Sequence, residues 1–306
     1  MKTLLTTLCL SLALMAPAFA TDAQAKRLFG EAQKKWDGDP EEVQALLKKA
    51  VAAAKSKPLR INLTLILGQF QQGKTGDFDA AIKNYQRVIA DTVGEKAKAM
   101  RNFKAQALMN LGIVYYTRKH NLDEAVIKLT DSLEMSPTCY TADNLSQLLY
   151  RLGRDTKRSE LSRKLQLEKS LKIARISLEL DRENADRAST PARRAKLRLQ
   201  LVIVLTALGK TDEAKAEWKA TEEKALKNNA LYQMAILKAL RGGTADEVAV
   251  PLKEALKVRP SPVARNQIRW FIRTEPDLAK FVKEASWKAL VTDEEEPKKK
   301  KRRKAK

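Results

Sequence analysis

A recurring pattern of small and large apolar residues constrains this chain more than any other feature. It is clearest over residues 105–137, which carry Leu111-Gly112, Tyr115, Ala125 and Pro137. A helical stretch, a turn and a second helical stretch recur at residues 60–91, 192–227 and 228–260, and more weakly at residues 25–54. Such recurrence indicates serial helix pairs, each of which hides its apolar face only against the next pair.

Composition favours the same fold class. Ala, Leu, Lys, Glu and Arg dominate the chain, and these residues are well suited to helices. Aromatic residues make up only 6% of the sequence, while 44% hydrophobic and 31% charged residues is an ordinary globular balance. We therefore predict an all-α protein with a substantial buried core.

The repeated residues resemble the tetratricopeptide repeat. In that family, small residues at the Gly and Ala positions let two helices approach closely, and a proline ends the second helix. The Gly112 to Ala125 spacing is one residue longer than the consensus, which we attribute to an enlarged turn at residues 118–121. The resemblance covers residues 21–291. It implies a right-handed superhelical solenoid of about six antiparallel helix pairs at a 34-residue period, followed by capping helices.

Two segments depart from the regular pattern. Between Asn144 and Ala185, about a dozen extra residues separate two helical stretches, which predicts either a long loop or an extended helix. Glu275–Leu278 resembles the start of a terminal helix in the closing segment of such arrays. Polar residues there would shield the last open face of the stack.

The first residues have the three-part layout of a secretory signal peptide. Lys2 precedes an apolar stretch, Leu4–Met15, and Ala18-Phe19-Ala20 forms a cleavage site. We predict removal of residues 1–20 after Ala20 and a periplasmic location; a retained membrane anchor or a buried helix are the alternatives. Loss of Cys9 would leave Cys139 as the sole cysteine, which excludes an intramolecular disulfide.

One short motif points to a nucleotide. Residues 68–75, GQFQQGKT, satisfy the phosphate-loop pattern, whose backbone amides cradle phosphates. Its four intervening residues are bulky, although a phosphate loop needs backbone freedom, and the turn at Gly76–Asp79 displaces the following helix start. We interpret the segment as helical and Lys74 as a solvated turn residue.

The sequence does not favour chemistry elsewhere. His120 is the only histidine, which argues against His-rich metal sites and His-assisted nucleophiles. We expect it to be a solvated loop residue. We accordingly expect no metal, no cofactor, no small-molecule substrate and no catalytic site.

Charge is concentrated at the C-terminus. The formal net charge is +22, and an acidic run, Asp293–Glu296, precedes a strongly basic one. We predict that residues 292–306 form a disordered tail. Its basic side chains would bind polyanions, whether anionic lipid, cell-wall polymer or nucleic acid, through Lys298, Lys299, Lys300, Lys301, Arg302, Arg303, Lys304 and Lys306.

These features predict a non-catalytic adaptor or scaffold of the bacterial cell envelope. It would bind a protein or peptide in a concave groove along the first helices of the repeats. Candidate groove residues are Gln69, Asn110, Tyr116, Asn144, Gln147 and Gln200. The competing interpretation makes them ordinary exposed helix residues. The alternative function is polyanion binding through the tail.

Overall fold

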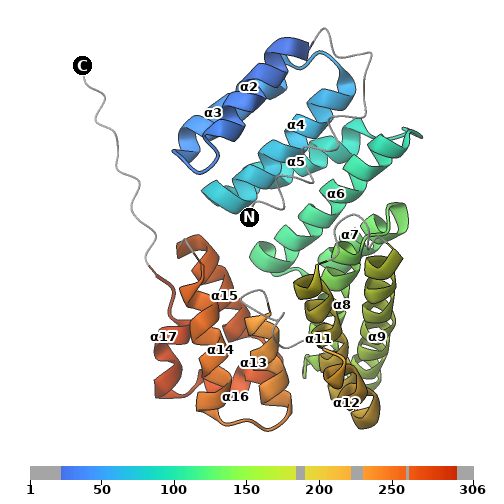
Figure 1. Ribbon diagram of the computed structural model, residues 1–306, viewed down its shortest axis with the longest axis vertical. Helices are drawn as coiled ribbons and strands as arrows, with labels where there is room; N and C mark the ends of the chain where they lie inside the picture. The colour runs from blue at the N-terminus through green and yellow to red at the C-terminus, as the bar shows by residue number, and fades with distance from the viewer. Residues whose placement is uncertain (1–21, 184–189, 222–229, 260–261, 295–306) are drawn as a thin grey trace. The chain divides into compact units, whose positions relative to one another are not determined.

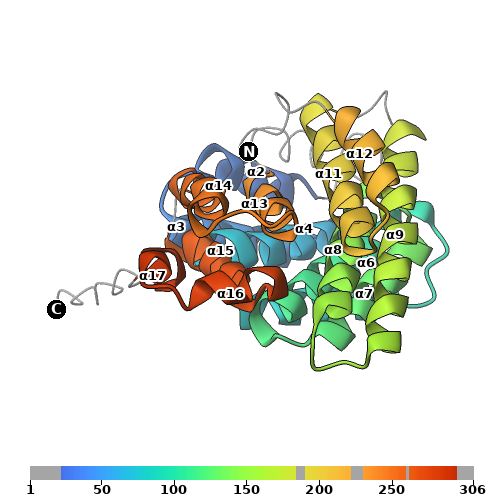
Figure 2. The ribbon, with the colours of Figure 1, turned by 90° about the horizontal axis from the view of Figure 1, so that it is seen from below.

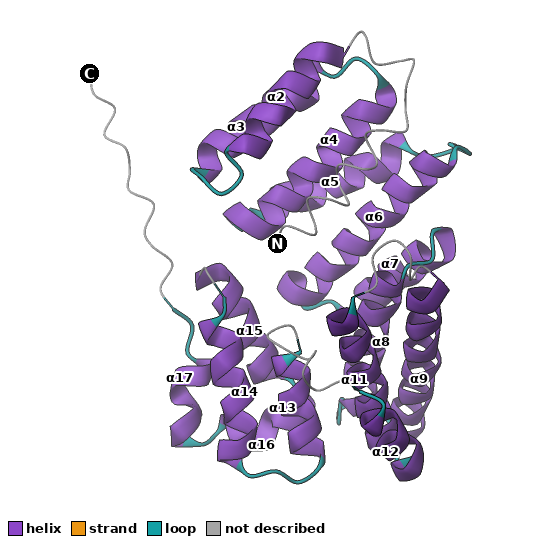
Figure 3. Cartoon of the chain, viewed as in Figure 1, coloured by secondary structure: helices purple, strands orange, loops and turns teal. Residues whose placement is uncertain are grey.

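The computed structural model describes residues 22–183, 190–221, 230–259 and 262–294 (Figure 1). Every regular element in these ranges is a helix (Figure 3), which confirms the all-α prediction. The chain divides into two compact units, Met1–Ser136 and Pro137–Lys306, called here unit 1 and unit 2. Within the described ranges, none of the helices is both long enough and apolar enough to span a membrane.

Unit 1 is built from consecutive helix pairs. They are α2 (Ala23–Lys34) with α3 (Pro40–Ala53), α4 (Lys57–Phe70) with α5 (Phe78–Asp91), and α6 (Lys98–Val114) with α7 (Leu122–Met135). Two π-helices, η2 (Gln71–Thr75) and η3 (Tyr115–Lys119), follow α4 and α6. Each α-helix packs against the next one along the chain.

Helix α4 is the centre of unit 1. Leu63 and Ile66 join a core shared with α2 and α3, whereas Ile61 and Leu65 join a core shared with α5 and α6. A helix that is apolar on all sides must be covered on all sides. The pair α4–α5 therefore depends on both of its neighbours, as serial packing requires.

Unit 2 continues the pairing and ends in shorter helices. Its elements are α8 (Cys139–Arg154), α9 (Glu160–Glu183), α11 (Pro191–Ala207), α12 (Thr211–Lys219), α13 (Leu231–Leu240), α14 (Ala245–Lys257), α15 (Pro262–Thr274), η5 (Pro276–Leu278), α16 (Ala279–Val282), η6 (Ala285–Trp287) and α17 (Lys288–Val291). Helices α8, α9, α11 and α12 lie together in both views (Figures 1 and 2). With 24 residues, α9 confirms the extended-helix alternative for this region.

The packing of adjacent helices confirms the predicted pairs, but the period is uneven. First helices of the first four pairs begin at Ala23, Lys57, Lys98 and Cys139. The first interval equals the 34 residues that the tetratricopeptide resemblance implies, whereas the next two are longer, so a constant period is wrong. The first helices of these two longer intervals, α4 and α6, are each followed by an added π-turn. The superhelical solenoid stays a prediction, because the two units are described separately.

Glycine residues allow the closest contacts between paired helices. A Cβ atom on Gly68 would lie 2.8 Å from Cε1 of Tyr85, and one on Gly153 would lie 2.6 Å from Cγ of Leu167. At Gly112, the corresponding distance to Cγ of Leu129 is 3.0 Å. Real Cβ contacts almost never fall below 3.0 Å. The absence of a side chain is therefore what brings these helices together.

Unit 2 also folds back on itself. Asp277 in η5 accepts a hydrogen bond from Arg154 Nε at 2.8 Å and another from the hydroxyl of Tyr150, which lies 127 residues earlier. In a linear array, a helix contacts only neighbouring pairs. The closing segment therefore does more than was expected of it from the sequence, because it also carries a carboxylate that pairs with α8.

A second buried acid strengthens this contact. Glu275 is 1% exposed, accepts a 2.8 Å hydrogen bond from the Tyr232 hydroxyl, and lies 3.7 Å from Nε of Arg151. Burial raises the pKa of Glu275, against the opposing effect of the Arg151 charge. Removing one partner of a buried ion pair leaves an uncompensated charge, which is more costly than replacing both. We call Tyr150, Arg151, Arg154, Glu275 and Asp277 the α8–η5 clasp.

The close contact at Gly68 predicts a specific loss of stability. Gly68→Ala should lower the free energy of unfolding by about 1–3 kcal/mol, because the new methyl meets the Tyr85 ring, whose hydroxyl is fixed by a 2.7 Å hydrogen bond to Gln72. Gly30→Ala in α2 is the matched control, with nothing within 4 Å, and should stabilise by about 0.5–1 kcal/mol. Urea denaturation followed by circular dichroism measures both. Equal stability of the two variants would contradict the contact.

The clasp predicts a graded effect in unit 2. Asp277→Ala should cost about 3 kcal/mol, because it leaves the Arg154 guanidinium and the Tyr150 hydroxyl without their shared acceptor. Tyr150→Phe removes a single hydrogen bond and should cost about 1 kcal/mol. Thermal unfolding of the full chain compares them. If Asp277→Ala melts like the wild type, the clasp does not hold unit 2 together.

Candidate functional site

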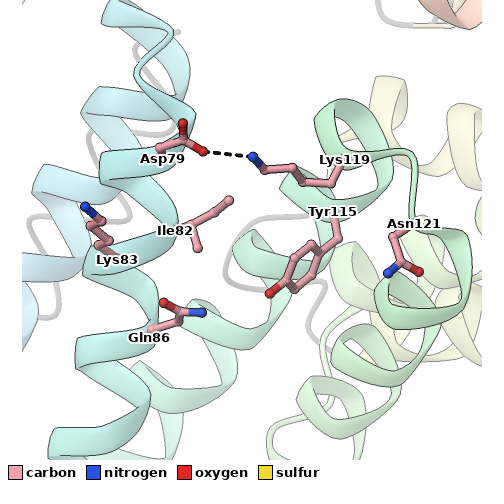
Figure 4. Close-up of a pocket in the computed structure, with 7 residues that line it drawn as sticks. All are labelled: Asp79, Ile82, Lys83, Gln86, Tyr115, Lys119 and Asn121. Carbon is pink, nitrogen blue, oxygen red and sulfur yellow. Dashed lines mark hydrogen bonds and ion pairs between the residues drawn. The ribbon is translucent and has the colours of Figure 1, made fainter.

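A cavity of about 570 Å³ opens in unit 1 between α5 and the π-helix η3 (Figure 4). We call it the α5–η3 groove. Helix α5 contributes two charged, one apolar and one amide side chain; η3 contributes an aromatic ring and a lysine; the residue that caps α7 contributes an amide. These residues are Asp79, Ile82, Lys83, Gln86, Tyr115, Lys119 and Asn121.

The π-turn η3 shapes the groove. The backbone N–H of Asn121 donates to the carbonyl of Tyr115 at 3.1 Å, and His120 between them adopts a left-handed φ of 53°. A π-turn accommodates one extra residue within a helix. The long Gly112 to Ala125 spacing therefore has its explanation here: the enlarged turn predicted at residues 118–121 exists, and it begins at Tyr115.

The preceding pair has the same construction. The N–H of Asp77 donates to the carbonyl of Gln71 at 3.1 Å, and Gly76 adopts a left-handed φ of 68°. In both pairs the next residue caps the following helix: Asp77 accepts from the N–H of Ala80 and Asn121 from that of Glu124. The π-turn is therefore a repeated feature of unit 1.

An ion pair bridges the two sides of the groove. Lys119 Nζ lies 2.8 Å from Asp79 Oδ1 (Figure 4). The hydrogen bond and charge of Lys119 lower the pKa of the Asp79 carboxyl, and the charge of Lys83 adds to the effect. One repeat earlier, Lys74 and Asp37 make an equivalent contact at 2.8 Å. The pair thus also serves to align successive helix pairs, at an exposed position where salt weakens it.

The side chains that line the groove are of kinds that can recognise a peptide. Gln86 and Asn121 supply amide groups, Ile82 and Tyr115 supply apolar surface, and charges of both signs line the edge. Such a set can hydrogen-bond a peptide backbone while it receives an apolar side chain. The side chains of Asp79 and Lys119 are 77% and 46% exposed, so a ligand would keep one face in solvent.

The groove residues proposed from the sequence lie elsewhere. In unit 1, Gln69 and Tyr116 are half-buried and do not line the cavity, and Asn110 is 7% exposed. The assignment of Asn110 to an open surface is wrong, because its position on α6 faces the interior. Sequence reasoning missed the lining of the actual cavity, although the long Gly112 to Ala125 spacing marked its location.

The other three proposed residues belong to unit 2. Asn144 and Gln147 are half-buried on α8. Gln200 is 3% exposed, and its Nε2 lies 3.4 Å from Oγ of Ser146, where α8 and α9 meet closely through Ser146 and Ser170. Gln200 is therefore a packing residue of unit 2, and its assignment to a binding surface is wrong.

The phosphate-loop match is a helix end. Gly68–Phe70 completes α4 and Gln71–Thr75 forms η2, which confirms the helical interpretation. Gly68 packs against Tyr85, and Lys74 pairs with Asp37. Residues 68–75 therefore serve the packing of unit 1.

His120 lies in an exposed turn, as expected.

Other predictions fall at the chain ends. Residues 1–20 and the basic side chains from Lys298 to Lys306 lie outside the described residues. Thr292–Glu294, assigned to a disordered tail, are described, and Asp293 and Glu294 bond to arginines of α15. The tail boundary drawn at residue 292 is therefore too early, because these acids have basic partners within the fold.

No protein-family model matches this chain, and no curated protein sequence is significantly similar to it.

Proposed function

We propose that this protein is a non-catalytic adaptor that binds an extended segment of another protein in the α5–η3 groove. The observation that carries the proposal is the lining of that groove: amide, apolar and charged side chains contributed by two successive helix pairs. The tetratricopeptide resemblance points the same way, since grooves of stacked helix pairs bind peptides. On the basis of residues 1–20, we place the adaptor in the bacterial periplasm.

The character of the groove favours a peptide over a compact small molecule. Small-molecule sites bury most of their ligand within predominantly apolar walls. Here the side chains of Asp79, Lys83 and Gln86 on α5 are exposed, and the cavity is open to solvent. An extended chain can place one side chain against Ile82 and Tyr115 while its backbone meets the amides and its other face stays in water.

Peptide selection against the intact protein tests this proposal. Peptides from a random displayed library that bind the wild type should bind Gln86→Trp about tenfold more weakly or worse, because the indole fills the groove. Gln106→Trp is the matched control: it adds the same ring at an exposed position on α6 outside the lining, and should bind normally. Failure to select any binder, or equal loss in both variants, would refute the groove as the site.

Polyanion binding by the basic tail is the second candidate function, and one contact favours it. Asp293 and Glu294, the acids that precede the tail, are engaged by arginines of α15. Carboxylates that pair with these arginines are not available to neutralise the lysines of residues 298–306, which supports binding of these residues to lipid, cell-wall polymer or nucleic acid.

Retention on heparin separates this function from the groove. Deletion of residues 298–306 should markedly lower the salt concentration at which the protein elutes, because phosphate- and sulfate-type contacts depend steeply on salt. Gln86→Trp should elute like the wild type. Unchanged elution after the deletion would rule out the tail as the polyanion site.

A further inference from the structure

Helix α15 presents a row of basic side chains to the end of the chain. Arg265, Arg269 and Arg273 are spaced four residues apart, which places them on one face of the helix. We call them the arginine stripe. Asp293 and Glu294 contact this stripe from the segment that follows α17 and its C-cap residue, Thr292. All of these residues belong to unit 2.

The arginines hold both carboxylates at several points. Arg265 Nε donates to Oε1 and Oε2 of Glu294 at 2.8 and 2.9 Å, and Arg269 Nη2 donates to Oε1 at 2.9 Å. Arg273 Nη1 and Nη2 donate to Oδ1 and Oδ2 of Asp293 at 2.8 and 3.0 Å. Forked contacts of this kind are the strong, geometrically selective form of carboxylate recognition.

Asn266 recognises the backbone of the same segment. Its Nδ2 donates to the carbonyl of Glu294 at 3.0 Å, and its Oδ1 accepts from the N–H of Glu294 at 2.8 Å. One amide side chain thus pairs with both backbone polar groups of a single residue. Fully ionised phosphate and sulfate groups offer hydrogen-bond acceptors and no such donor. The surface is therefore complementary to a polypeptide with adjacent acidic side chains.

The recognising groups are more deeply placed than the segment they hold. The Arg269 side chain is 9% exposed, whereas those of Glu294 and Asp293 are 34% and 50% exposed. Hydrogen bonds from Arg265 and Arg269 lower the pKa of Glu294 to about 2, so the contact is fully charged at neutral pH. Release of the segment would leave three positive charges on one helix face, one of them nearly buried. Such a face favours a replacement acid.

We propose that the arginine stripe with Asn266 is a binding site for acidic peptide segments of a partner protein, and that Asp293–Glu294 occupies it as an internal competitor. A tethered segment has a high effective concentration, on the order of millimolar for short linkers, so an external peptide must displace it. Neutralising the internal acids removes this competition while it keeps their size and backbone.

Fluorescence anisotropy with a labelled peptide of sequence TDEEE tests the proposal on the full chain. The variant D293N/E294Q should bind the peptide about tenfold more tightly than the wild type, or better. The variant D212N/E213Q is the matched control: it makes the same change in charge at an adjacent Asp-Glu pair on exposed α12 and should bind like the wild type. Adding R265A to D293N/E294Q should abolish the gain.

Two outcomes would overturn the proposal. One is an equal gain in affinity for the peptide in D293N/E294Q and D212N/E213Q. The other is displacement of the labelled peptide by inorganic phosphate that supplies the same concentration of negative charge as an effective concentration of unlabelled peptide. If D293N/E294Q fails to fold, amide hydrogen exchange on the wild type takes its place. Millimolar TDEEE should accelerate exchange of the Glu294 N–H, which donates to Asn266. Unchanged exchange at that amide would also refute the competition.

Discussion

Close approach of helices without intervening side chains is the constraint on which this structure rests. Gly68 lies against Tyr85, Gly112 against Leu129, and Gly153 against Leu167. In each contact, a Cβ atom on the glycine would lie 3.0 Å or less from the neighbouring side chain. The two helices of each pair therefore pack closely, and the apolar face that they leave open is covered by a neighbouring pair. Helix α4, buried on all sides, shows how one pair depends on the next.

Polar chemistry is arranged around this packing in three ways. Inserted π-turns in unit 1 widen the connection between paired helices and create the groove proposed to bind a peptide. In unit 2, the α8–η5 clasp fixes the closing helices to α8 through buried acids. On α15, an arginine stripe holds two acids at the surface. The basic excess of the chain is therefore partly structural and partly available for recognition.

Sequence reasoning reached the helix pairs and the helical nature of the phosphate-loop match, because these follow from local spacing. It offered the long helix α9 only as one of two alternatives. It could not reach the clasp: Tyr150 and Asp277 are 127 residues apart, and a buried acid looks like a solvated one in sequence. Asn110 and Gln200 are buried because neighbouring helices cover the faces of α6 and α11 on which they lie. Which face is covered is set by the tertiary packing. The docking of Asp293 and Glu294 depends on a distant arginine row, so composition alone suggested disorder.

Hydrogen exchange with a selected peptide bound tests the central claim most directly. If the α5–η3 groove is the recognition site, amides at residues 79–86 and 115–121 should exchange more slowly in the complex, and those around Asn144 and Gln147 on α8 should not change. Protection confined to α8, with no effect on α5 or η3, would contradict the account and return the binding site to the first-helix surface predicted from sequence.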